Sequence, residues 1–166
     1  VSCAIVGFIV GAVGMTGLGQ VIAMNIMKFS GGHLWVASIL CMVASLVLGM
    51  GLPSTACYIV TATIAAPAMQ TMGVNPLAAH FFAFYFGTMS GVVPPVALTS
   101  FTAAGLAGAK PTKVALVGLA LASSGLILPF LFVYNPVLLL VDFSWGPFLY
   151  EAAIAALGIF ALSVSF

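Results

Sequence analysis

Long apolar runs separated by short polar turns make up nearly the whole chain, and the spacing of the turns predicts its helices. A bilayer core of about 30 Å needs roughly 20 helical residues to cross it. The apolar run over residues 1–27 is long enough for one crossing, with residues 3–27 as its helix, and a polar turn follows at residues 28–33. Residues 113–134 and 147–166 fit two further crossings. These three runs predict ordinary membrane-spanning helices.

Residues 34–72 form an apolar run that is too long for one straight crossing, because a helix rises only about 1.5 Å per residue. No charged residue divides this run, but a Gly/Pro segment at residues 49–55 interrupts its middle. Each half falls short of a full span, and the run ends at a turn signal at residues 73–76. We therefore expect a re-entrant helical hairpin over residues 34–72, with its tip, residues 49–55, at membrane depth.

Residues 77–108 form a second overlong apolar run, and a second Gly/Pro segment interrupts it at residues 90–95. This run predicts a single crossing made of two half-helices. Together, the runs predict one all-α integral membrane domain over residues 1–166.

Composition supports a lipid environment for this domain. Hydrophobic residues make up 64% of the chain and charged residues only 3%, whereas about one quarter of a soluble domain is charged. Mean hydropathy is +1.35. The net charge of +1 and the lack of arginine exclude nucleic acid as a partner, because phosphate binding needs clustered positive charge. The lipid bilayer is therefore the expected solvent.

The chain termini and the lysines carry further information about topology. Apolar sequence begins at the first residue without a charged segment before it, which argues against a signal peptide. Both ends fall within apolar runs, so we expect the chain to be part of a larger permease. With a hairpin that opens to one side of the membrane, we expect Lys28 and residues 73–76 on that side and Lys110 and Lys113 on the other, and the excess of positive charge favours the side of Lys110 and Lys113 as cytoplasmic.

The two Gly/Pro breaks need a physical reason, because irregular backbone survives at membrane depth only where protein buries it or water reaches it. Proline has no N–H and leaves the carbonyl four residues before it without a helical partner. The prolines of the two breaks are Pro53, Pro94 and Pro95. The carbonyls that they free are those of Gly49, Ser90 and Gly91. Such oxygens, at the partly negative end of a half-helix, suit a hard cation such as Na⁺.

The half-helices that follow the breaks start near Pro53 and Pro95, and their free N–H groups suit an anionic substrate group. Neighbouring hydroxyls add further ligands. The predicted ion and substrate site comprises Gly49, Gly51, Pro53, Ser54, Thr55, Thr88, Ser90, Gly91, Val92, Pro94 and Pro95. Packing kinks without any ligand are the alternative interpretation of a single break. Two breaks in neighbouring long segments favour a transport site instead.

The remaining polar residues have plainer interpretations. His80 follows the turn at residues 73–76, so a helix-start or packing role is favoured over a proton relay. We expect His33, Asp142 and Glu151 to be solvated near the membrane surface. Packing is expected for Tyr58, Tyr85 and Tyr134, and Cys3, Cys41 and Cys57 are expected to be free thiols. No catalytic triad, metal cluster or phosphate loop occurs in the sequence, so an enzyme and a cofactor other than the coupling ion are not expected.

Four segments together resemble the permeases of the TRAP transporters. They are residues 49–60 (GMGLPSTACYIV), 76–86 (PLAAHFFAFYF), 90–98 (SGVVPPVAL) and 130–136 (FLFVYNP). The similarity is closest to the fused permeases, in which the small and large membrane subunits form one chain. It covers nearly the whole sequence.

This resemblance implies a fold, an activity and a set of partners. Permeases of this kind contain two inverted repeats, each with a re-entrant hairpin and a broken helix, and residues 1–166 would be the second repeat of such an elevator-type fold. The family imports organic anions, often carboxylates, into bacteria or archaea across the cytoplasmic (inner) membrane, using a Na⁺ gradient. A soluble extracytoplasmic (periplasmic) binding protein delivers the substrate. The N-terminal half of the same permease would supply the rest of the site. A passive channel and a purely structural membrane domain are the alternatives.

Overall fold

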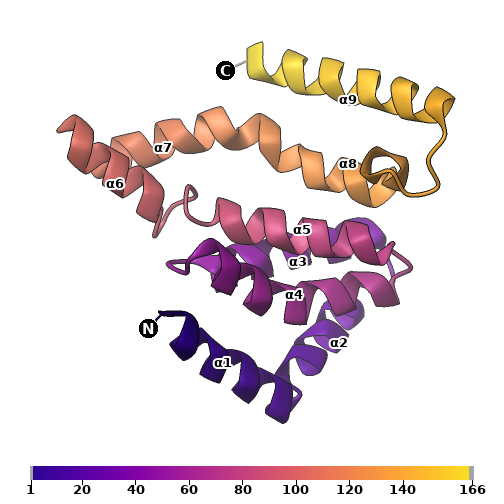
Figure 1. Cartoon of the computed structure of the whole chain (residues 1–166), viewed down its shortest axis with the longest axis horizontal. Coiled ribbons are helices and arrows are strands. Elements are labelled where there is room, and N and C mark those ends of the chain that lie inside the picture. The colour runs from indigo at the N-terminus through magenta and orange to yellow at the C-terminus, as the bar shows by residue number, and fades with distance from the viewer. Residues whose placement is uncertain (1, 165–166) are drawn as a thin grey trace.

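The computed structural model describes residues 2–164, and this part of the chain is built from helices joined by short loops (Figure 1). The α-helices are α1 (Ser2–Thr16), α2 (Leu18–Ser30), α3 (Leu34–Gly49), α4 (Ser54–Thr71), α5 (Pro76–Met89), α6 (Leu98–Ala107), α7 (Pro111–Ala122), α8 (Leu128–Tyr134) and α9 (Trp145–Val164). Two short 3-10 helices are η1 (Ser123–Ile127) and η2 (Pro136–Leu139). The prediction of an all-helical protein is confirmed, and residues 1, 165 and 166 lie outside the described part.

Helices α3, α4 and α5 pack side by side and hold the core (Figure 1). Nine residues of α4 are buried, mostly alanine and other small residues that let its neighbours approach closely. Large side chains fill the rest of the core. Phe82 and Phe86 are both fully buried, and their rings contact that of Phe130 of α8 edge-on at 5.3 and 5.8 Å between centroids.

The first predicted span is divided rather than continuous. We predicted one helix over residues 3–27, but α1 and α2 meet at an angle at Gly17 (Figure 1). Gly17 has φ +65°, a left-handed conformation that ends an α-helix and that glycine adopts without a steric penalty. The apolar pattern predicts the length of this run but is insensitive to a single left-handed residue within it.

The run over residues 34–72 forms two neighbouring helices, α3 and α4, joined by a loop at residues 50–53. This helix–loop–helix agrees with the predicted interruption at residues 49–55. The depth of its tip in a membrane stays a prediction.

The run over residues 77–108 is also interrupted at the predicted segment. Helix α5 ends at Met89 and α6 begins at Leu98, so the irregular stretch extends two residues beyond the predicted break at residues 90–95. After it, α6 diverges from the α3–α5 layer and pairs with α7 (Figure 1).

The span predicted at residues 113–134 is not an ordinary α-helix throughout. Its middle tightens into η1, which separates α7 from α8. A close contact accompanies this segment, because a methyl group at Gly125 would lie 2.7 Å from the Tyr85 hydroxyl oxygen. Pro111–Tyr134 and Trp145–Val164 are the two helical stretches of the described chain that are long and apolar enough to cross a membrane. The second agrees with the span predicted at residues 147–166.

Helix α9 lies beyond α7 and α8 from the core, and its side chains are largely exposed (Figure 1). One polar contact attaches it to the rest of the structure, since Asn135 Nδ2 donates a hydrogen bond of 2.9 Å to Glu151 Oε2. Glu151 is only partly exposed. The expectation that this carboxylate is simply solvated is therefore wrong, because it serves as an acceptor between α9 and the end of α8.

Candidate functional site

The two Gly/Pro breaks lie against each other in the structure. Gly49 ends the first helix of the hairpin, and a methyl group there would lie 2.5 Å from the Gly87 carbonyl oxygen and 2.6 Å from Ser90 Oγ. Gly87 and Ser90 stand at the end of α5, where the second break begins. Only a residue without a side chain permits this approach. Two segments separated by about forty positions in sequence therefore form one local structure.

The loop at residues 50–53 continues this contact across the second break. Gly51 has φ +75°, which lets the loop turn sharply between α3 and α4. A methyl group on Gly51 would lie 3.9 Å from Val96 Cγ1, an ordinary van der Waals contact. The hairpin loop thus lies beside the residues that connect α5 to α6.

The second break is an ordered turn rather than an open gap. The amides of Val92 and Val93 donate to the Met89 carbonyl, and the peptide bond between Pro94 and Pro95 is cis. Ala97 then adopts a left-handed conformation, with φ +38°, directly before α6. The second half-helix begins at Leu98 and not at the predicted position near Pro95.

The carbonyl of Gly91 is not left bare, so that expectation is wrong. It accepts a hydrogen bond of 2.7 Å from Thr99 Oγ1 and one of 3.1 Å from the Thr99 amide. Ser100 Oγ similarly donates to the Val92 carbonyl at 3.4 Å. The first turn of α6 folds back onto the break and supplies donors that the proline pattern alone does not reveal.

The other two predicted carbonyls keep free acceptor capacity. The Gly49 oxygen accepts one hydrogen bond, of 3.3 Å, from the Leu52 amide. No donor within the described residues reaches the Ser90 oxygen. A carbonyl oxygen has two lone pairs, so one lone pair remains free on the Gly49 oxygen and two remain free on the Ser90 oxygen. These two oxygens belong to the two segments that meet where Gly49 lies against Gly87 and Ser90, a contact that we call the seam.

The predicted hydroxyls divide into engaged and free groups. Ser90 Oγ is buried and donates to the Gly87 carbonyl. Thr88 Oγ1 bonds back within α5, to the carbonyls of Phe84 and Tyr85. Ser54 and Thr55 are exposed in the first turn of α4, where no side chain caps the helix. Free hydroxyls and free amides therefore gather at this helix start, which carries the partly positive end of the helix dipole.

A hollow lies beside the second break, with a volume of about 340 Å³. Its lining residues are Pro94, Pro95, Phe101, Thr112, Ala115 and Leu116. It connects the break to the α6–α7 pair and is apolar apart from the Thr112 hydroxyl. The described residues contain no group of three or more His, Cys, Asp or Glu side chains that could bind a metal ion. A cation at the breaks would therefore depend on carbonyl and hydroxyl oxygens.

A separate hollow of about 280 Å³ surrounds His80, between α4 and α5. Tyr58 Oη lies 3.1 Å from His80 Nδ1, within hydrogen-bonding distance, and the Tyr58 ring contacts Phe84 edge-on at 5.7 Å. His80 thus packs against α4 rather than only starting α5.

Two residues of the seam were missed by sequence reasoning, namely Cys57 and Gly87. A methyl group at Gly87 would lie 2.9 Å from Cys57 Sγ. One signal was available, because Gly87 stands four positions after Ala83 and four before Gly91, and small residues at that spacing mark a close helix approach. Cys57 carries no comparable signal, since a buried cysteine in an apolar run is ordinary.

Comparison with known proteins gives one family. The family model described as "Tripartite ATP-independent periplasmic transporter, DctM component" matches residues 1–146. The match includes both breaks and leaves out nearly all of α9. No curated protein matches the chain, and no solved structure does.

Proposed function

The chain belongs to the DctM family of tripartite ATP-independent periplasmic transporters, a family of membrane permeases, and on this premise we propose that it forms half of a Na⁺-coupled site for organic anions. The proposed reaction is secondary active import, in which Na⁺ entry drives the uptake of a carboxylate or a similar anion. In this role the chain is part of a transporter rather than an enzyme.

The meeting of the two breaks supports this proposal most directly. The Gly49 and Ser90 carbonyls, which keep free lone pairs, belong to the two segments that meet where Gly49 lies against Gly87 and Ser90, and a shared oxygen site needs oxygens from both segments. Hard cations bind such neutral oxygens, and unwound backbone at helix ends provides them in transporters. A packing kink would need neither a second break nor uncommitted carbonyls.

The start of α4 supports an anion site next to the cation. Its first amides have no side-chain cap, and the Ser54 and Thr55 hydroxyls are exposed beside them. The N-terminus of an 18-residue helix attracts a carboxylate through free N–H groups and the helix dipole. Pairing an anion with a nearby Na⁺ then couples the binding of one to the binding of the other.

The partners follow from the family. We propose that a soluble periplasmic binding protein delivers the anion, that the N-terminal half of the permease completes the pocket, and that the assembly resides in the cytoplasmic membrane. The re-entrant arrangement of α3 and α4 and an elevator-type motion belong to the same proposal.

The decisive experiment is uptake into proteoliposomes that contain the full permease, with its binding protein and the anion outside. Accumulation should require an inward Na⁺ gradient and should stop when K⁺ replaces Na⁺. Equal flux without Na⁺ would indicate a passive channel and would contradict the coupling.

A pair of serine variants tests the site itself. Ser54→Ala removes an exposed hydroxyl with no internal partner, so it should leave the melting temperature unchanged and raise the Na⁺ concentration for half-maximal uptake. Ser163→Ala in α9 is the matched control, because Ser163 is also exposed but only bonds back to the Phe160 carbonyl. Unchanged uptake in both variants would favour a structural role for the breaks.

A further inference from the structure

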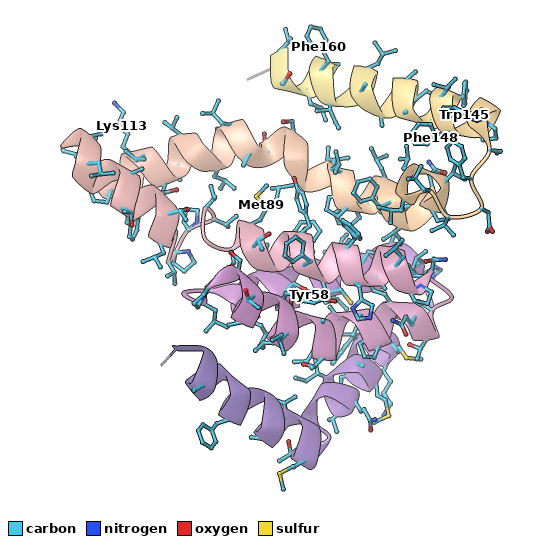
Figure 2. All side chains as sticks on the ribbon, in the orientation of Figure 1. Tyr58, Met89, Lys113, Trp145, Phe148 and Phe160 are labelled. Carbon is cyan, nitrogen blue, oxygen red and sulfur yellow. The ribbon has the colours of Figure 1, made fainter. Side chains whose placement is uncertain are left out.

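Four small residues close the seam between the hairpin and the broken helix. Gly49 ends α3, Cys57 lies in the first turn of α4, and Gly87 and Ser90 lie at the end of α5. All four are buried, with Cys57 only 1% exposed and Ser90 only 2% exposed. Figure 2 labels Tyr58, the chain neighbour of Cys57, between α4 and α5, and Met89, the chain neighbour of Ser90, on the side of α5 that faces η1.

The contacts at Gly87 come entirely from side chains of α4. A methyl group there would lie 2.9 Å from Cys57 Sγ and 3.1 Å from Thr61 Oγ1. Thr61 itself is held in place, since its hydroxyl donates to the Ala83 carbonyl of α5 at 3.1 Å. The Cys57 sulfur therefore occupies the space that a side chain at position 87 would need. The same sulfur would lie 2.6 Å from a methyl group at Gly49, so it touches both sides of the seam.

We infer that Cys57 and Gly87 are positioning residues that fix the separation of the Gly49 and Ser90 carbonyls and so tune the binding of Na⁺. This inference rests on the proposed function, which places Na⁺ between the two breaks. Neither Cys57 nor Gly87 contributes a free oxygen to the ion. Their role is to set how far the hairpin end stands from the end of α5, because a binding constellation must be held to within about 0.5 Å to work.

The first test enlarges position 87 in the full permease and measures the binding of radioactive Na⁺ alone to the purified protein. Gly87→Ala pushes against Cys57 Sγ, so the carbonyls separate and Na⁺ affinity should fall about tenfold. Gly105→Ala is the matched control in α6, because a methyl group there meets no atom within 4 Å. This control should bind Na⁺ as the unsubstituted permease does.

The second test removes the sulfur that causes the clash. The double variant Cys57→Ala with Gly87→Ala exchanges one atom for another within the seam, so Na⁺ affinity should return to within about threefold of the original. Because the first variant enlarges position 87, a general loss of packing would not be repaired by shortening the side chain at position 57. Recovery in the double variant is therefore specific to positioning.

Two variants of Cys57 test the inference in the case that Gly87→Ala does not fold. Cys57→Ala alone should weaken Na⁺ binding, whereas Cys57→Ser, which keeps an atom of similar size, should preserve it. Cys41→Ala is the control, because Cys41 is also buried but contacts the Ala65 carbonyl, away from the breaks. It should lower thermal stability and leave Na⁺ affinity unchanged.

The outcomes separate the inference from the function on which it rests. If the unsubstituted permease does not bind Na⁺, the proposed function is wrong. If it binds Na⁺ and neither Gly87→Ala nor Cys57→Ala changes the affinity, the inference alone is wrong. Equal losses of affinity in the Cys57→Ala and Cys41→Ala variants would likewise contradict a positioning role.

Discussion

At the scale of single residues, glycines and small hydroxyls determine how the two breaks meet. Gly49 allows a backbone carbonyl and a serine hydroxyl to approach to distances that any side chain would block. Thr99 then donates a hydrogen bond to the Gly91 carbonyl, one of the carbonyls that the prolines leave without a helical partner. The chemistry available at the seam depends on which oxygens these residues leave free, rather than on any charged group.

The Thr99 hydroxyl provides a direct test of this view. Thr99→Val keeps the shape of the side chain and removes the 2.7 Å bond to the Gly91 carbonyl, so the full permease should lose about 1 kcal/mol of stability. Thr99→Ser retains the hydroxyl and should lose less. Thermal unfolding in detergent would compare them, and equal melting temperatures for all three proteins would contradict the assigned contact.

Sequence reasoning located both breaks but not the details of their bonding. The prolines identify carbonyls without helical partners, because proline has no N–H. They do not reveal that Thr99, eight residues after Gly91, returns a donor to that oxygen. The pairing of Gly49 with Gly87 was also hidden, since it depends on the tertiary packing of α3, α4 and α5. Local rules therefore predicted the positions of the two breaks. Long-range packing decides which groups contact the backbone at each break.

At the scale of elements, left-handed residues and 3-10 turns divide runs that look continuous by hydropathy. Gly17 separates α1 from α2, and η1 separates α7 from α8. Small and polar residues stand at both junctions, at residues 16–20 and 123–125, but neither junction holds a charged residue, so hydropathy alone does not divide the runs. A conformational preference at one residue is enough to redirect a helix.

The bend at Gly17 can be tested against a neighbouring glycine. Gly17→Ala places a methyl group in open space but on a left-handed backbone, so it should destabilise the bend by about 1 kcal/mol. Gly14→Ala also meets open space but lies within α1, where alanine favours the helix. Thermal unfolding should therefore shift in opposite directions for the two variants. A stabilising Gly17→Ala would show that the bend is not required.

The packing of η1 against α5 allows a rescue experiment. A methyl group at Gly125 would lie 2.7 Å from the Tyr85 hydroxyl oxygen, so Gly125→Ala should destabilise the permease by about 1–3 kcal/mol, the usual cost of overpacking. Tyr85→Phe removes that oxygen and should restore most of the loss in the double variant. Additive losses in the two single variants and the double variant would contradict the contact.

At the scale of the whole molecule, the turns gather at opposite ends. The turn between α4 and α5 lies at one end of the long axis and the turn between α6 and α7 at the other (Figure 1). The loop between α3 and α4 lies between these two ends along the same axis (Figure 1). With the long axis placed along the membrane normal, this arrangement holds the hairpin tip within the membrane, as the proposal requires.

Cysteine labelling can test the proposed orientation. In a full permease whose other cysteines have been replaced by serine, Ala109→Cys places a thiol at the exposed turn between α6 and α7, and His33→Cys places one at the turn before α3. Because Lys110 and Lys113 favour the cytoplasmic side, a membrane-impermeant maleimide should label Ala109→Cys only in inverted vesicles. His33→Cys should be labelled only in right-side-out vesicles. The reverse pattern would overturn the topology.

The contact between Cys57 Sγ and the bare backbone of Gly87 has an evolutionary consequence. Both residues share one small volume. A lineage that gains a methyl group at position 87 must therefore already have a smaller side chain at position 57. Across related permeases, side-chain sizes at these two alignment columns should therefore vary inversely. The order of the two changes should also be constrained, with truncation at the cysteine position preceding enlargement at the glycine position.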